Sequence, residues 1–140
     1  MEKREPSDLD IDLGRLEWEW ARQPGLREES GRRLAGARLR HSEAKDALAV
    51  TEAEVALEVR DNPSKFGLQK ATEASIEAAT TIDVRVGEAK KLLNRAKHAV
   101  DVLESYVAAV DHKKHALQDE VQMLLAGFFA APRSKDKEWG

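Results

Sequence analysis

Hydrophobic positions recur at helical spacing in three stretches of the chain. In the first, residues 8–22, four apolar side chains share one helix face: Leu9, Leu13, Leu16 and Trp20. Ile11 and Trp18 lie on a second face, so this short N-terminal helix needs two partners. The sequence "QPG" at 23–25 should end it, because proline disfavours helix in the residue before it.

A second helix is predicted from Leu26 to Arg60. Alternating steps of three and four residues give it a narrow seam of mostly small side chains: Leu34, Ala37, His41, Ala44, Leu48, Thr51 and Val55. The sequence "DNPSKFG" at 61–67 is a turn signal that separates this helix from the next.

The third stretch runs from about Thr72 to Phe129. Thr80 and Thr81 are poor helix formers and Asp83 can cap a new helix, so we expect a break there. Beyond the break a heptad repeat follows: Ala89, Ala96, Leu103, Val110, Leu117 and Leu124, with Leu92, Ala99, Tyr106, Lys113 and Glu120 at the complementary position. Pro132 should stop the helix, and we expect residues 133–140 to form a polar, disordered tail after a single helical domain over 1–132.

The length of the third helix argues for self-association. From Asp83 to Phe129 it would be about 70 Å long, whereas a compact chain of this size has a radius of gyration of roughly 14 Å. We therefore expect an all-α, elongated hairpin of two long helices plus the short N-terminal helix, assembling into a ring-like homo-oligomer. The expected interface residues are Trp18, Trp20, Leu103, Val110, Leu117 and Leu124.

Composition supports a helical, non-enzymatic chain. Charged residues make up 35% of it, aromatic residues 5%, and cysteine is absent. No glycine-rich phosphate loop occurs, and we expect no enzymatic activity, no cofactor and no metal. The apolar run "VQMLLAGFFAAP" is about half the roughly 20 residues that span a bilayer, which favours a soluble, cytoplasmic protein without membrane contact.

The charge is segregated along the chain. The formal net charge is −3, yet residues 31–45 carry five basic side chains against Glu43, and residues 85–98 carry five against Glu88. The sequence "DHKKH" at 111–115 interrupts the heptad seam, and three interpretations of it stay open. Lys113 can extend to solvent along its stem, pair with an acidic helix, or contact phosphate. His112 and His115 have a spacing that can hold a divalent metal, but two imidazoles alone favour unliganded polar side chains.

Three strings together resemble the UvsY-like family of phage recombination mediators. "IDLGRLEWE" (11–19) resembles a segment near the start of the family, "VALEVR" (55–60) resembles the end of its second helix, and "AVDHKKHALQDEVQM" (109–123) parallels its C-terminal helix. The order of the strings and the chain length agree, so the resemblance spans nearly the whole chain.

The resemblance implies a ring-forming protein that binds single-stranded DNA and helps load a RecA-like recombinase in place of the single-strand-binding protein. Arg60 and Lys114 match basic positions of the family, and Lys113 matches a serine beside them. Glu58 and Asp111 stand where the family has lysine, which puts that part of the DNA site in doubt. The charge pattern adds further DNA-binding candidates: Arg32, Arg33, Arg38, Arg40, Lys91 and Arg95. The alternative is a structural or chaperone-like helical oligomer that binds protein partners without DNA.

Overall fold

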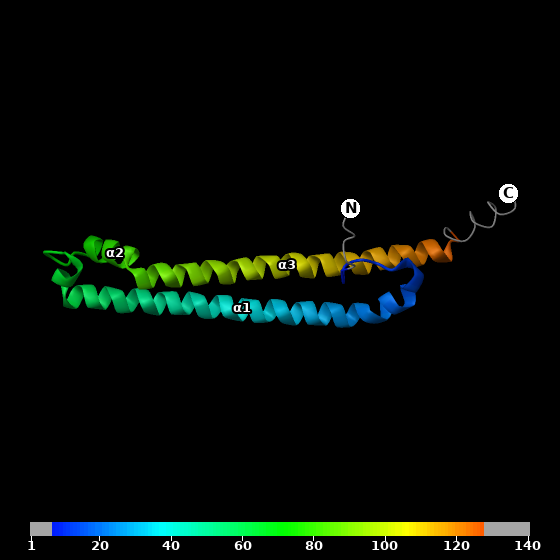
Figure 1. Ribbon diagram of the computed structural model, residues 1–140, viewed down its shortest axis with the longest axis horizontal. Helices are drawn as coiled ribbons and strands as arrows, with labels where there is room; N and C mark the ends of the chain where they lie inside the picture. The colour runs from blue at the N-terminus through cyan, green and yellow to red at the C-terminus, as the bar shows by residue number, and fades with distance from the viewer. Residues whose placement is uncertain (1–6, 128–140) are drawn as a thin grey trace, which may run out of the picture. The chain divides into compact units, whose positions relative to one another are not determined.

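Helices make up almost all of the described chain. The computed structural model describes residues 7–127, in which the short 3-10 helix η1 (Leu13–Arg15) leads into α1 (Leu16–Asp61). The 3-10 helix η2 (Pro63–Phe66), α2 (Glu73–Ile82) and α3 (Val84–Leu125) follow in order (Figure 1). No strand occurs within these residues, so the all-α prediction with two long helices is confirmed. The elongated hairpin and the ring stay predictions.

The separate N-terminal helix is a wrong prediction. Helix α1 continues through Pro24 to Asp61 without a break, and the residues before Leu16 form turns and η1. Proline inside a helix removes one hydrogen bond and costs about 3 kcal/mol. Contacts with α3 on both sides of the proline offset this cost: Gln23 Nε2 donates to the carbonyl oxygen of Val110 at 2.8 Å, and Arg27 Nε lies 3.0 Å from Asp111 Oδ1.

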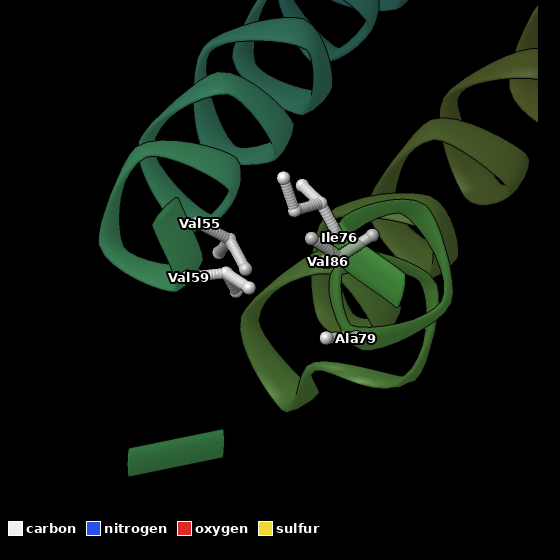
Figure 2. Close-up of a cluster of buried hydrophobic side chains, with 5 residues drawn as sticks. All are labelled: Val55, Val59, Ile76, Ala79 and Val86. Carbon is white, nitrogen blue, oxygen red and sulfur yellow. The ribbon is translucent and has the colours of Figure 1, made fainter. Parts of the chain in front are cut away.

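The chain divides into two compact units, of which the second is Leu34–Leu103. Its core consists of five buried side chains from α1, α2 and the start of α3: Val55, Val59, Ile76, Ala79 and Val86. Figure 2 shows Val55 and Val59 of α1 facing Ile76 of α2 and Val86 of α3. Because α2 has ten residues, the packing of its apolar face on α1 supplies stability that so short a helix lacks alone.

The connections in the second unit follow the predicted turn signals. Gly67 ends η2 with φ of 72°, a left-handed conformation that glycine adopts without a steric penalty. Thr72 then caps α2, because its hydroxyl accepts from Ser75 N at 3.2 Å while Ser75 Oγ accepts from Thr72 N at 2.8 Å. At Asp83 the backbone is extended, and its carboxylate accepts from Arg85 N at 2.9 Å, which confirms the predicted break.

The first unit pairs the start of α1 with the end of α3, and its described part covers 7–33 and 104–127. Contacts run antiparallel, because Glu19 pairs with Lys113, Gln23 donates to Val110, and the Arg33 guanidinium lies over the ring of Tyr106. The buried apolar side chains of this unit are Leu26, Val107, Val110 and Leu117.

Helix α3 ends earlier than predicted. Its last residue is Leu125, and Gly127 follows with φ of 78°, so a left-handed glycine ends the helix before the predicted Phe129. Pro132 and the tail 133–140 lie outside the described residues. The heptad prediction holds best at Val110 and Leu117, which are fully buried, whereas Leu92 and Leu124 are exposed.

Candidate functional site

A local excess of basic side chains lies on α3 within the second unit. Five residues form what we call the cationic face, and all five are exposed: Lys90, Lys91, Arg95, Lys97 and His98. The only acid between Val86 and Val100 is Glu88, whose Oε1 lies 3.4 Å from Lys91 Nζ. Such a surface attracts polyanions, since each phosphate neutralised by a lysine or arginine releases a counterion.

Helical spacing divides the cationic face into two rows. Lys91, Arg95 and His98 lie within about 60° of one another around α3 and form the outer row. Lys90 and Lys97 are seven residues apart, about 20° around the helix, and form the side row. Val86 is buried and Leu93 half-buried on the side of α3 opposite the outer row, so the outer row faces away from the core. The side row lies within about 60° of Val86 and Leu93 around the helix and flanks the packed side of α3.

Among the predicted DNA-binding residues, Lys91 and Arg95 belong to this face. The sequence interpretation missed Lys90, Lys97 and His98 as site residues. The signal was present, because the excess of basic side chains over 85–98 already included both lysines.

The basic residues of α1 do not form one surface. In the first unit, Arg32 Nη2 lies 3.3 Å from Glu28 Oε2, and the Arg33 guanidinium lies 5.8 Å from the ring centre of Tyr106. In the second unit, Arg38 and Arg40 lie about 200° apart around the helix. These arginines are exposed but point in different directions within each unit, and the charge of Arg32 is already paired with Glu28.

Arg60 and Glu58, which resemble the family's second-helix site, form ion pairs in this chain. Arg60 Nη2 lies 3.4 Å from Glu73 Oε2. Glu58 accepts from both terminal nitrogens of Arg85, at 2.9 and 2.6 Å. A carboxylate held bidentately by arginine stabilises the start of α3 against α1 and offers no positive charge to a phosphate.

The contacts of Arg85 make the free energy of unfolding depend on pH in the acid range. Its hydrogen bonds hold the pKa of Glu58 and the pKa of Asp83 below their usual values. A carboxyl group with a lowered folded-state pKa contributes stability above its unfolded-state pKa and loses it as pH falls through the folded-state pKa.

We therefore expect Arg85→Met to lower the urea midpoint at pH 7, with a difference from wild type that shrinks at an acid pH below the lowered folded-state pKa values of the two carboxyls. Arg40→Met, at an exposed position in the same unit, should leave the midpoint nearly unchanged at both values. If the urea midpoint of Arg85→Met lies as far below that of wild type in acid as at pH 7, the ion pairs of Arg85 do not cause the loss of stability.

The structure corrects the prediction that Lys113 contacts DNA. Its ammonium is buried: Nζ lies 3.0 Å from Glu19 Oε2 and donates to the carbonyl oxygen of Asp8 at 2.6 Å. The side chains of Lys113 and Glu19 are each 2% exposed, so this charge is neutralised inside the first unit and is not offered to phosphate. The neighbouring Lys114 is exposed, because it lies about 100° further around α3.

The predicted oligomer interface needs the same correction. Val110 and Leu117 are fully buried within the chain itself, and Leu103 and Trp20 are half-buried, whereas Leu124 is exposed. Trp18 is exposed, with the guanidinium carbons of Arg15 and Arg22 at 4.1 and 4.4 Å from its ring centre. A heptad pattern indicates only that a position is buried. In this chain Val110 and Leu117 are already buried within the first unit, so they do not need a second subunit to cover them.

Three further features bear on the kind of site present. A hollow of about 670 Å³ lies between α1, α2 and the start of α3, lined by alanines of α1, by Glu52, Glu73 and Glu77, and by Lys90 of the side row. Lys90 therefore shares this hollow with three carboxylates. Within residues 7–127, no group of three or more histidines and carboxylates is arranged to hold a metal ion. None of the helices in this range combines the length and apolar character needed to cross a membrane.

Comparison of the chain with models of protein families, with curated proteins and with solved structures finds no match. The resemblance to UvsY-like mediators therefore rests on the three sequence strings alone.

Proposed function

We propose that this protein is a non-enzymatic, self-associating helical protein that binds single-stranded DNA through the cationic face of α3. The observation that carries the proposal is the set of five exposed basic side chains from Lys90 to His98, a stretch of α3 in which Glu88 is the only acidic residue between Val86 and Val100. The resemblance to UvsY-like mediators supplies the biological role: loading a RecA-like recombinase onto DNA that a single-strand-binding protein covers.

The charge of one chain limits how tightly one copy can bind. With a formal net charge of −3, the contact has to come from the local cationic face and not from the overall field. A ring that presents one such face per subunit along a single strand would convert weak contacts into high avidity. This is why self-association and DNA binding belong to the same proposal.

The test is titration of a fluorescent oligo-dT at several salt concentrations. If each copy neutralises about four phosphates, log affinity should fall with log salt at a slope near −3 per copy engaged. The variant Lys90→Glu/Lys97→Glu removes the side row and should make the slope shallower by about 1.4 per copy, with a large loss of affinity at low salt.

The matched control is Lys65→Glu/Lys70→Glu, which changes the net charge equally at two exposed lysines outside the cationic face. It should keep nearly the wild-type slope. Absence of wild-type binding at about 50 mM salt, or equal losses for the two variants, would refute the cationic face as the DNA site.

A second candidate function is a helical oligomer that binds protein partners without DNA. It is favoured by apolar side chains on the outside of α1, where Leu39, Val50 and Leu57 are each more than half exposed. The same titration discriminates the two, because this function predicts an assembled protein that does not bind oligo-dT.

A further inference from the structure

The outer face of α1 in the second unit combines apolar and acidic side chains. Leu39, Val50 and Leu57 lie within about 20° of one another around the helix, and Val55 on the opposite side is fully buried in the core. Glu43 and Asp46 occupy the same face between Leu39 and Val50 and are exposed. Within the described chain, neither acid forms an ion pair.

The outer face of α3 in the same unit has the complementary composition. Val84 and Val102 are both more than half exposed and point in the same direction as the outer row of the cationic face, which lies between them. The distance from Val84 to Val102 along α3 is about 27 Å, and the distance from Leu39 to Leu57 along α1 is also about 27 Å, since both pairs are eighteen residues apart.

We propose that the outer face of α1 docks antiparallel on the outer face of α3 of a second copy of this chain. When Leu39 is set opposite Val102, Leu57 falls opposite Val84, so that apolar side chains meet at both ends. This register also places Asp46 opposite Arg95, and Glu43 opposite His98. The inference rests on the self-association in the proposed function and assigns the surfaces that bring it about.

The charge pattern selects the antiparallel orientation. In the parallel alignment of the same end residues, Glu43 falls opposite Glu88, and like charges placed directly opposite one another are destabilising. In the antiparallel alignment, Val50 falls opposite Lys91, whose aliphatic stem can cover it while the ammonium remains in water.

This contact joins two different surfaces and therefore propagates. Each outer face lies on the side of its helix that points away from the shared core of Val55, Val59 and Val86 (Figure 2). A copy docked through its α1 face still has its own α3 face open for another copy, which is a heterologous contact that gives a ring if it closes and a filament if it does not. Lys90 and Lys97 lie about 100° or more from Lys91 around α3 and remain outside this contact. Because the outer row is then used between copies, two lysines per copy remain for DNA, and the salt slope of the assembled protein should be near about −1.4 per copy engaged and not near −3.

The experiment is charge reversal with rescue, measured as mass by sedimentation velocity at micromolar concentration. Lys91→Glu/Arg95→Glu makes both faces acidic, and Glu43→Lys/Asp46→Lys makes both basic, so each variant alone should lose the oligomer while keeping its helical circular dichroism. An equimolar mixture should regain it, because acidic and basic faces then alternate between the copies. The chain with all four reversals should also assemble by itself, whereas the control Lys65→Glu/Lys70→Glu should retain the wild-type mass.

The outcomes separate this inference from the proposed function. A wild-type oligomer whose mass survives both reversals, or a loss that neither the mixture nor the fourfold variant restores, overturns the docking surfaces and leaves self-association standing. A wild-type monomer overturns self-association itself. Loss of oligo-dT binding by Lys90→Glu/Lys97→Glu with the oligomer intact supports both proposals, since it separates the DNA row from the docking row.

Discussion

Replacing Lys113 with methionine should destabilise the protein by up to about 3–5 kcal/mol, because the substitution leaves the buried Glu19 carboxylate with only the Arg22 guanidinium, 3.8 Å away, as a counter-charge. It also removes the hydrogen bond to the Asp8 carbonyl oxygen, which holds the segment before α1 against α3. Urea unfolding followed by circular dichroism, at one fixed protein concentration, measures the change.

The chain supplies a matched control for this prediction in the next residue. Lys114→Met makes the same substitution at an exposed position and should change stability by no more than about 0.5 kcal/mol. The double variant Glu19→Leu/Lys113→Met should recover most of the loss, since replacing both members of a buried ion pair by apolar side chains is often neutral or stabilising. A single variant as stable as wild type would mean that Lys113 is in contact with water.

Replacing Ile76 with alanine should cost about 2–5 kcal/mol, because this side chain fills the core between α2, Val55 and Val86. The same unfolding experiment should show a large drop in the urea midpoint. Ile82 provides the control within the same helix: it is 82% exposed, whereas Ile76 is 5% exposed. Ile82→Ala should therefore have little effect on stability, and equal effects at the two positions would contradict the packing of α2 described above.

Local signals were sufficient to predict most of the helix boundaries. The Asn-Pro and glycine signals at 61–67, the capping threonine at 72 and the threonine pair before Asp83 act through nearby backbone, so sequence spacing alone gave the right boundaries. Pro24 misled the prediction because contacts with α3 hold the helix together on both sides of it. Those contacts involve residues far away in the sequence, so the residues around Pro24 alone do not indicate them.

The site was only partly predictable for the same reason. A lysine in a heptad seam is compatible with solvent, with a phosphate or with a buried carboxylate, and only the fold places Glu19 beside Lys113. Val110 and Leu117 carry a seam pattern that does not distinguish a partner subunit from the chain's own α1. The cationic face of α3 was visible as a local excess of charge, because one helix carries all of it and no long-range contact is needed to assemble it.

One sedimentation experiment with labelled oligo-dT measures mass and DNA binding together and addresses most directly the claim that copies gather in order to line up their α3 charges. We expect a wild-type oligomer that co-sediments with oligo-dT at about 50 mM salt and releases most of it at about 200 mM. A folded monomer that leaves the oligonucleotide free at the lower salt concentration would contradict this claim.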